Sequence, residues 1–241
     1  MILDIDVGNS YAKWRIVSSS GEKISGAQTV ESILKQQRLN FDCQEQICQV
    51  RLSSVSSNEV PTILQDQFKS EFGANLQQAA VSRSAGGVTC GYLAPSTLGI
   101  DRWLAMVAAY SRYHQPVVVV DAGSAITIDV VSADGLHLGG YILPGLDLAR
   151  ASLWHGTQKV KAEYRNTSDA GLGKSTTDAV NNGVIFSVIT AINQLANSYD
   201  GLVVLTGGSA SALESLINLP MQLVPDLVLD GLAISDVVFY F

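Results

Sequence analysis

Two short segments of the chain repeat an Asp-x-Gly pattern, Asp6–Ser10 and Asp121–Ala125. Each follows a short apolar run, Ile2–Ile5 in one case and Val117–Val120 in the other, of the kind that forms a strand. A glycine directly after a strand lets backbone amides approach a phosphate, and a carboxylate there can hold hydrated Mg²⁺. The repeated pattern therefore indicates a metal–nucleotide site and favours phosphoryl transfer as the chemistry.

The first segment offers three groups for that chemistry. Gly8 allows the backbone to come close to a phosphate, Asp6 could hold Mg²⁺, and Lys13 could reach a terminal phosphate as a point charge. The alternative is an ordinary hairpin turn with a surface lysine. The second copy at Asp121 favours the functional interpretation, because two coincident turns at equivalent places are harder to dismiss.

The second segment offers an opposing set of groups. Asp121 could bind a cation, and Ser124 could donate a hydrogen bond to a phosphate. The alternative for Asp121 is a buried aspartate that caps the following turn. Farther along, Thr206–Ser209 follows the strand expected at Leu202–Leu205, and such a glycine-rich turn lets a base or ribose lie against the backbone. A tight strand–helix turn would use the same residue types.

The helix start at Gly99–Arg102 brings an aspartate and an arginine together. Asp101 has a reference pKa of about 3.9, so it is ionised at neutral pH and could orient and deprotonate an attacking hydroxyl. Arg102 could clamp a substrate carboxylate with its planar fork. The alternative for Asp101 is a capping role, because aspartate is favoured at helix N-termini.

The elements that must position these residues also repeat. With a single-residue gap, the match between the two halves continues beyond the Asp-x-Gly segments. The further matched positions are Val17-Ser18 with Val131-Ser132, Gly21 with Gly135, Ile24 with Leu138, and Gly26 with Gly140. A duplicated strand–Asp-x-Gly–hairpin unit predicts two like domains that face a cleft.

Hydrophobic periodicity and turn residues predict an α/β protein with a domain boundary near Pro116, hence domains of residues 1–115 and 116–241. Strands are expected at Ile2–Val7, Tyr11–Ser18, Glu22–Ala27, Ile47–Leu52, Leu76–Ala80, Val117–Val120, Ala125–Ser132, Leu136–Leu143 and Leu202–Leu205. Helices are expected at Val30–Arg38, Asn58–Phe72, Ile100–His114 and Thr176–Tyr199.

Composition narrows the partners and the compartment. The 241 residues are 47% hydrophobic and carry a net charge of −7, which argues against nucleic acid because that partner needs a basic face. Three cysteines without metal-ligand spacing, and an N-terminus without a basic leader, predict a reduced, cytoplasmic protein. The most apolar stretch, Pro116–Val131, is interrupted by Asp121 and Asp129, so no membrane span is expected.

Over nearly its whole length the chain resembles type III pantothenate kinases, members of the actin-like, sugar-kinase-like ATPase superfamily. The residues that carry the resemblance are Asp6–Ser10 with Lys13-Trp14, Gly99–Trp103, Asp121–Ala125, Gly139–Gly145, Thr176 seven residues before Gly183, and Thr206–Gly208. The resemblance implies two ribonuclease-H-like domains of the actin-like ATPase fold with a central cleft. It also implies ATP-dependent phosphorylation of pantothenate, the first step of coenzyme A biosynthesis.

The resemblance implies a role for each matched residue. Asp101 would be the catalytic base, Asp121 would ligate a monovalent cation, K⁺ or NH₄⁺, and Asp6 would contribute to Mg²⁺ binding. ATP would be bound by Asp6, Val7, Gly8, Asn9, Ser10, Tyr11, Ala12, Lys13 and Ser124. Pantothenate would be bound by Tyr92, Gly99, Ile100, Asp101, Arg102 and Thr176.

Family members are homodimers, so the resemblance implies a homodimer with the long helix of the second domain at the interface. Three positions depart from the family's usual residues. Ser124 replaces Thr and keeps only the hydroxyl, Asp4 replaces an apolar residue, and Ser175 precedes Thr176 where Asn is frequent. The sequence alone does not decide whether Asp4 takes part in metal binding.

Two other functions are compatible with the same residues. One is another small-molecule kinase of the superfamily that acts on a sugar or acetate, which a substrate panel with ATP would separate. The other is a non-catalytic ATP-binding regulator, which would bind nucleotide without turnover. The Asp101-Arg102 pair beside Tyr92 favours an enzyme, because a pure nucleotide switch needs no second acceptor pocket.

Overall fold

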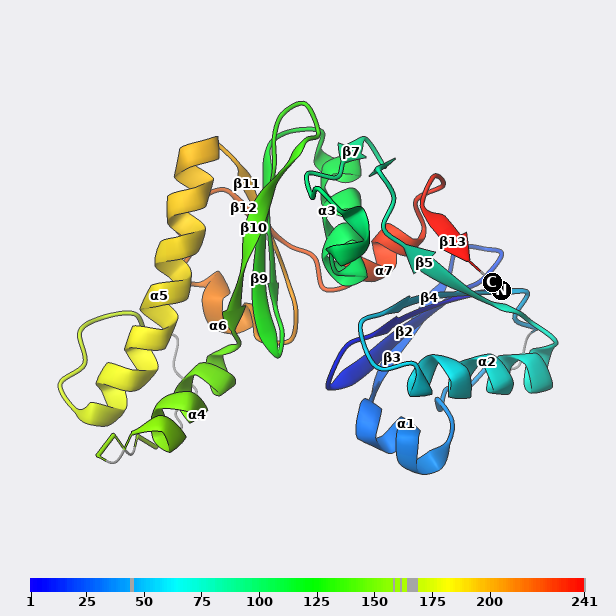
Figure 1. The fold of residues 1–241 in the computed structure, drawn as a ribbon, viewed down its shortest axis with the longest axis horizontal. Helices are drawn as coiled ribbons and strands as arrows, with labels where there is room; N and C mark the ends of the chain where they lie inside the picture. Colours follow the sequence, from blue (N-terminus) through cyan, green and yellow to red (C-terminus); the bar gives the residue numbers. More distant parts are fainter. Residues whose placement is uncertain (44–45, 158, 161, 164–168, 241) are drawn as a thin grey trace. The chain divides into compact units, whose positions relative to one another are not determined.

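The computed structural model describes residues 1–241 except 44–45, 158, 161, 164–168 and 241 (Figure 1). The chain divides into two compact units, Met1–Ala108 together with Leu227–Phe241, and Ala109–Asp226. Each unit has its own main sheet and its own hydrophobic core. The predicted α/β class is confirmed.

The first unit is built on a six-stranded mixed sheet of order β13-β5-β4-β1-β2-β3. Strands β1, β2 and β3 form an antiparallel meander, β4 and β5 run parallel to β1, and β13 closes the edge antiparallel to β5. The strands are β1 Ile2–Val7, β2 Tyr11–Val17, β3 Lys23–Thr29, β4 Gln49–Ser54, β5 Leu76–Ala80 and β13 Val238–Tyr240.

The second unit is built on a five-stranded sheet of order β10-β9-β8-β11-β12. Strands β8, β9 and β10 form an antiparallel meander, and β11 and β12 run parallel to β8. The strands are β8 Val117–Ala122, β9 Ala125–Val131, β10 His137–Pro144, β11 Leu202–Thr206 and β12 Met221–Leu223. This order and direction repeat those of β1 to β5, strand for strand.

The repeat extends to the turns between strands. Gly21 and Gly135 have φ of 84° and 78°, in the left-handed region that glycine adopts without steric cost. The N–H of Gly21 donates to the carbonyl of Ser18 at 3.1 Å, and that of Gly135 donates to Ser132 at 3.0 Å. These matched glycines are therefore explained by one turn used twice.

The two faces of the first sheet are chemically different. Strand β1 alternates, so Leu3, Ile5 and Val7 enter the core formed with α1 (Val30–Gln36) and α2 (Glu59–Phe72). Asp4 and Asp6 therefore lie on the opposite face, which α7 (Leu227–Leu232) covers through contacts with β1 and β4. Figure 1 shows α7 and the α1–α2 pair on opposite sides of this sheet.

Helix α5 (Thr176–Tyr199) packs on β8, β9 and β11 and is the main helix of the second core. In the described part of the chain it is the one helix that is long and apolar enough to cross a membrane by length and composition alone. Half of its most apolar window is buried inside the protein, and its buried residues belong to the second core. The other helices of this unit are α4 (Leu146–Gly156) and α6 (Ala210–Glu214).

The segment between β5 and α3 contains short regular elements. Strands β6 (Ser84–Ala85) and β7 (Val88–Thr89) form a two-stranded hairpin, and a 3₁₀ turn follows at Pro95–Thr97. Gly86 and Gly87 form the connection with φ of 54° and 81°. The Gly-Gly pair sets this tight turn, and α3 (Ile100–Tyr113) follows the 3₁₀ turn.

The C-terminal segment returns to the first unit. Strand β13 pairs with β5, and α7 packs on β1 and β4, so 227–241 belongs with 1–108. The division between the units falls within α3, after Ala108. Division of the sequence into halves of residues 1–115 and 116–241 stays a prediction about the underlying repeat.

Candidate active site

A polar row crosses three strands of the first sheet at the carboxyl end of β1. Asp6 lies opposite Lys13 on β2 and opposite Ser53 on β4. The Ser53 hydroxyl donates to Asp6 Oδ1 at 2.9 Å. Asp6 and Lys13 are both partly exposed. The row therefore places a carboxylate between a hydroxyl and an ammonium group at an edge that solvent can reach.

The loop that follows Asp6 is held at two backbone positions. The N–H of Gly8 donates to the carbonyl of Tyr11 at 2.9 Å, and the carbonyl of Ser10 accepts from the N–H of Val30 at 3.0 Å. Asn9, Ser10 and Tyr11 are exposed. A Cβ at Gly8 would lie 3.4 Å from the Tyr11 carbonyl and meet nothing closer, so the fold itself does not require glycine there.

The second unit contains the same loop with one residue fewer. The N–H of Gly123 donates to the carbonyl of Ala125 at 3.0 Å, and the carbonyl of Ser124 accepts from the N–H of Gly145 at 3.2 Å. Gly145 precedes α4 as Val30 begins α1. The single-residue gap in the match between the two halves therefore falls in this loop, which is one residue shorter in the second unit. By position, Ser124 is the counterpart of Ser10.

The charges around the second carboxylate differ from those around the first. Asp121 lies opposite Thr127 on β9 and opposite Thr206 on β11. Thr206 thus takes the place of Ser53, while Thr127 takes the place of Lys13. The second row has no lysine, so the chemistry of its donor set is that of oxygen ligands alone.

The glycine-rich turn after β11 packs directly on this carboxylate. Gly207 has φ of 96°, and a Cβ there would clash with the Asp121 carboxylate and with the Ala122 backbone. Gly208 has open space on its Cβ side. The first glycine is therefore required by the close approach to Asp121, and the second leaves an accessible backbone surface.

Asp101 and Arg102 begin helix α3 and face different neighbours. Asp101 Oδ1 accepts from the N–H of Arg102 at 2.8 Å, so the carboxylate satisfies one of the free N–H groups in the first turn of α3, which is close to the capping role considered from the sequence. Gly99 makes room for it, because a Cβ there would lie 2.6 Å from Asp101 Oδ1. Asp101 is partly exposed, so capping fixes its orientation without burying the carboxylate.

The Arg102 side chain contacts Tyr92 in two ways. Its Nη1 donates to the Tyr92 hydroxyl at 3.0 Å, and the guanidinium carbon lies 5.7 Å from the centre of the Tyr92 ring. The side chain is buried, with 7% of its surface exposed. A buried guanidinium held by stacking and by hydrogen bonding has a fixed direction, which suits planar recognition of a carboxylate.

Thr176 is exposed in the first turn of α5, in the second unit. The preceding Ser175 is the N-cap: its Oγ accepts from the N–H of Asp178 at 3.1 Å and donates to Asp178 Oδ2 at 2.7 Å. This arrangement settles which hydrogen bonds the serine makes where the family often has Asn. A cavity of about 260 Å³ near this helix start is lined by Asp169, Leu172, Gly173, Lys174, Asp178, Asn181 and Asn182.

Asp4 forms ion pairs in the interior. It is fully buried, with Oδ2 3.2 Å from Arg15 Nη2 and Oδ1 2.7 Å from Arg51 Nε. Both carboxylate oxygens are thus engaged by guanidinium groups, which answers the question left by the sequence. Asp4 does not serve as a metal ligand in this arrangement.

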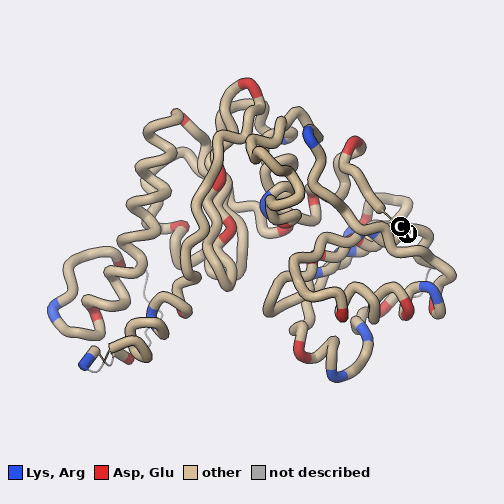
Figure 2. The backbone as a smooth tube through the Cα atoms, viewed as in Figure 1, with Lys and Arg blue, Asp and Glu red and all other residues tan. Residues whose placement is uncertain are grey.

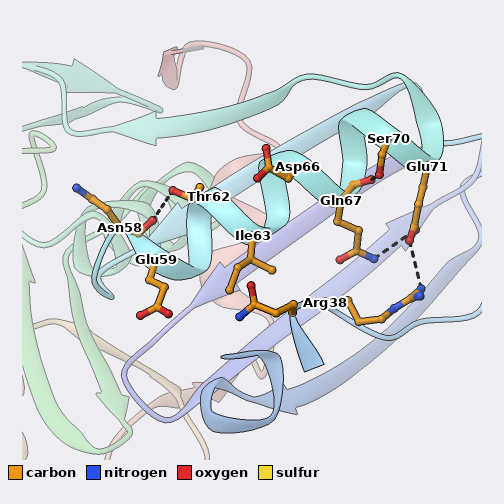
Figure 3. A pocket seen from close by; sticks show the side chains of 10 residues that line it. Arg38, Asn58, Glu59, Thr62, Ile63, Asp66, Gln67, Ser70 and Glu71 are labelled. Atoms are coloured by element: carbon orange, nitrogen blue, oxygen red, sulfur yellow. Dashed lines mark hydrogen bonds and ion pairs between the residues drawn. The ribbon is translucent and has the colours of Figure 1, made fainter. Parts of the chain in front are cut away.

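The larger of the two described cavities lies away from all these residues. It is a groove of about 840 Å³ between the end of α1 and helix α2 (Figure 3). Gln67 in its wall exchanges two hydrogen bonds with the Leu39 backbone, and Arg38 pairs with Glu71 at 3.4 Å. The groove contains no residue of the predicted site, so its size does not identify it as the active site.

Ser53 is the site residue that sequence patterns did not predict. The signal was a hydroxyl side chain near the end of β4, but recognising it requires knowing that β4 pairs with β1. The structure brings Asp6, Lys13 and Ser53 into one row and Tyr92, Asp101 and Arg102 into a second cluster of the same unit. Asp121, Ser124 and Thr176 belong to the other unit.

Comparison with known proteins supports one family. The profile of the family described as type III pantothenate kinase matches residues 2–198. A type III pantothenate kinase of Ectopseudomonas mendocina is 38% identical, and the match covers 98% of this chain and 98% of that protein.

Solved structures with the same fold are more distant in sequence. A Campylobacter jejuni protein provisionally described as a Baf family transcriptional activator has a TM-score of 0.61 at 23% identity, covering 96% of this chain and 95% of that one. A Sinorhizobium meliloti protein provisionally described as a 2-dehydro-3-deoxygalactonokinase has a TM-score of 0.55 at 12% identity, covering 97% of each chain. These similarities establish the fold, which is that of actin-like ATPases and sugar kinases.

Proposed function

Because the chain belongs to the type III pantothenate kinase family, we propose roles for its site residues in the reaction of that family. The protein transfers a phosphoryl group from ATP to pantothenate, the first step of coenzyme A biosynthesis. The observation that carries the assignment of roles is the Asp6–Lys13 pair at an accessible strand end, in the same unit as Asp101. The roles follow from the chemistry each side chain offers.

The β1–β2 loop holds the triphosphate. The N–H of Gly8 is engaged by the Tyr11 carbonyl, but the absence of a side chain at Gly8 lets a phosphate approach the other amides of the loop, which is the physical reason for a glycine that the fold does not require. Lys13 supplies a positive charge to the terminal phosphate. Asp6 provides carboxylate oxygen of the kind that would hold hydrated Mg²⁺, which when bound neutralises charge on the phosphates, and the buried Ser53 hydroxyl orients Asp6 by donating to Oδ1.

Asp101 acts as the base for the acceptor. The ionised carboxylate accepts the proton of the pantothenate primary hydroxyl. It also orients that hydroxyl, so that the hydroxyl oxygen attacks the γ-phosphorus in line. The hydrogen bond from the Arg102 N–H fixes one carboxylate oxygen, so the side chain is oriented before substrate arrives. Orientation of this kind is a main source of rate in phosphoryl transfer, where little covalent chemistry is left to the protein.

Arg102 recognises the other end of the acceptor. Pantothenate carries a carboxylate, and the planar guanidinium matches it in two parallel hydrogen bonds. The stacking with Tyr92 sets the direction of that fork. Arg102 and Asp101 are adjacent in sequence, so one helix start would hold the substrate's carboxylate and its reacting hydroxyl. Thr176 is assigned to the same substrate on the resemblance alone.

Asp121 holds a monovalent cation, K⁺ or NH₄⁺. Support comes from its neighbours in the strand register, which are Thr127 and Thr206 where the first unit has Lys13 and Ser53. A carboxylate beside hydroxyl groups, with no lysine in its row, provides the oxygen ligands that a hard monovalent cation takes. Ser124, exposed at the adjacent turn, is assigned to ATP.

The protein is assigned as a cytoplasmic homodimer with no nucleic-acid partner. Large apolar side chains are exposed on α4 and α5, among them Trp154 and Phe186, with 40% and 57% of their surfaces exposed. A second copy would remove that surface from water. Lys and Arg are distributed over both units in Figure 2, which does not favour a nucleic acid.

The experiment that tests the activity is mass-shift detection of phosphorylated pantothenate with purified protein, ATP, Mg²⁺ and K⁺. A panel that includes a hexose and acetate as acceptors should give product with pantothenate in large excess over the others. Turnover of a sugar or acetate in preference to pantothenate would overturn the assignment. Light scattering of the same sample should give twice the mass of the 25.6 kDa chain.

A further inference from the structure

Four charged residues form a network on the polar face of the first sheet, away from the edge where Asp6 and Lys13 lie. Arg15 is 3% exposed and contacts two carboxylates, Asp4 at 3.2 Å and Asp230 at 2.6 Å. Its Nη2 also donates to the carbonyl of Leu229 at 2.7 Å. Arg51 pairs with the same Asp4 at 2.7 Å. The network joins β1, β2 and β4 to α7.

Stability alone is a weak explanation for the burial of these charges. Burial acts to lower the pKa of the Arg15 guanidinium, but the Asp230 hydrogen bond and the charges of Asp4 and Asp230 outweigh it and raise that pKa. The guanidinium therefore stays charged. Well-packed apolar residues often replace such a buried network without loss of stability, so a network of this kind is weak evidence for a stabilising role.

The network lies directly behind the proposed phosphate-binding row. Arg51, Asp4 and Arg15 face one another across β4, β1 and β2, as Ser53, Asp6 and Lys13 do. The two rows are two residues apart along each strand, so they share one face of the sheet. A displacement of Arg15 would move β2 and therefore also displace Lys13, two residues away on the same strand.

Helix α7 connects that row to the helix that carries Asp101. Gly231 follows Asp230, and its Cα lies so close to α3 that a Cβ there would clash with the Leu104 carbonyl. Leu104 is three residues after Asp101, one turn farther along α3 on the same side. Arg15 shares strand β2 with Lys13 and pairs with Asp230, while Gly231 packs on Leu104 in the helix that carries Asp101. All of these residues belong to one unit.

We propose that Arg15 and Asp230 are positioning residues that fix the proposed base Asp101 relative to the phosphate-binding hairpin. The proposal rests on the function assigned above. In this role the Arg15–Asp230 pair does not touch substrate. It holds α7, and through α7 the start of α3, at a fixed position relative to β2. The acceptor hydroxyl is then placed for in-line attack on the γ-phosphate.

The test compares Arg15→Met and Asp230→Asn with Arg51→Met as a matched control. Arg51→Met also removes a guanidinium from Asp4, but the described hydrogen bond and ion pair of Arg51 are to Asp4 and not to a residue of α7. The measurement is the ratio of ADP formed to phosphopantothenate formed, because that ratio does not depend on how much of a sample is folded. Thermal unfolding of each variant is recorded in parallel.

Wild type should form about one ADP per phosphopantothenate, since closure around the acceptor limits hydrolysis. Arg15→Met and Asp230→Asn should slow phosphopantothenate formation by about tenfold or more and raise the ratio several-fold, because water replaces a misaligned hydroxyl. Arg51→Met should lower the melting temperature with the ratio unchanged.

Two failures are distinguishable. If wild type forms no phosphopantothenate, the assigned function is wrong. If wild type is active but Arg15→Met and Asp230→Asn keep its ratio, or if Arg51→Met raises the ratio equally, then the pair does not position Asp101 and the inference is overturned while the function stands.

Discussion

Asp6 lies directly opposite Lys13 in the antiparallel pairing of β1 with β2. The equivalent pair in the second unit is Asp121 with Thr127. One repeated hairpin thus carries a carboxylate–ammonium pair in one copy and a carboxylate–hydroxyl pair in the other. The first copy therefore carries a positive charge, which suits a phosphate. The second copy offers a carboxylate and a hydroxyl group, which suit a cation.

Lys13→Met should weaken ATP use. The loss of a charge-assisted contact to the terminal phosphate, worth about 1.5–3 kcal/mol, should lower kcat/KM for ATP by about 10- to 100-fold. Steady-state kinetics at saturating pantothenate measures the effect. The control is Lys23→Met, which removes an exposed lysine at the start of β3 in the same sheet. An ATP kcat/KM for Lys13→Met equal to that of the control would contradict the assignment.

Asp121→Asn should abolish the advantage of K⁺. Wild type is expected to be more active in KCl or NH₄Cl than in NaCl, because a site of fixed oxygen ligands discriminates by cation size. The amide lacks the charge that binds the ion, so the variant should give the same low rate in all three salts. Asp134→Asn, in the exposed turn after β9, serves as the control. A wild-type rate indifferent to the cation would refute the Asp121 role.

Arg102→Lys should damage recognition of pantothenate without affecting ATP. A lysine cannot reproduce the planar fork or the stacking with Tyr92, so the KM for pantothenate should rise by about tenfold or more. Pantothenol, in which a hydroxymethyl group replaces the carboxylate, should lose its disadvantage against pantothenate in this variant. The control is Arg112→Lys in the last turn of the same helix. Unchanged discrimination between the two acceptors would contradict carboxylate binding by Arg102.

Gly207→Ala and Gly208→Ala should differ sharply although the glycines are neighbours. Alanine at position 207 meets both a left-handed φ and the Asp121 carboxylate, so unfolding free energy should fall by at least about 2 kcal/mol. Alanine at position 208 meets open space and should change stability by less than about 0.5 kcal/mol. Urea unfolding followed by circular dichroism gives both values. Equal stabilities would mean that the turn does not pack on Asp121.

Local sequence patterns predicted the elements that bear the site. Strand β1, strand β5 and helix α5 begin and end at the expected residues. Strand β1 alternates between apolar and acidic residues, and α5 is a long apolar segment that begins directly after its cap, Ser175. The matched glycines at positions 21 and 135 identified a shared turn, since only glycine adopts its φ without cost. The repeat was therefore recognisable in the sequence, because both copies of the turn require glycine at the same position.

Local sequence patterns did not predict which distant segments of the chain pair with each other. Arg15 and Asp230 are 215 positions apart, and nothing in either neighbourhood indicates that they meet. The same holds for β13, a three-residue strand whose partner β5 lies far back in the chain. The role of Asp4 changed for this reason: alternation along β1 placed it correctly on the polar face, but its two arginine partners depend on β2 and β4.

Asp101→Asn tests most directly whether Asp101 deprotonates the acceptor. The amide keeps the shape of the side chain and an oxygen that can accept the capping hydrogen bond from Arg102, so the fold and ATP binding should persist. Single-turnover transfer from ATP to pantothenate, followed by mass-shift detection, should be slower by about 10²-fold or more, as expected for loss of a general base. Transfer at the wild-type rate by a folded, ATP-binding variant would contradict the claim.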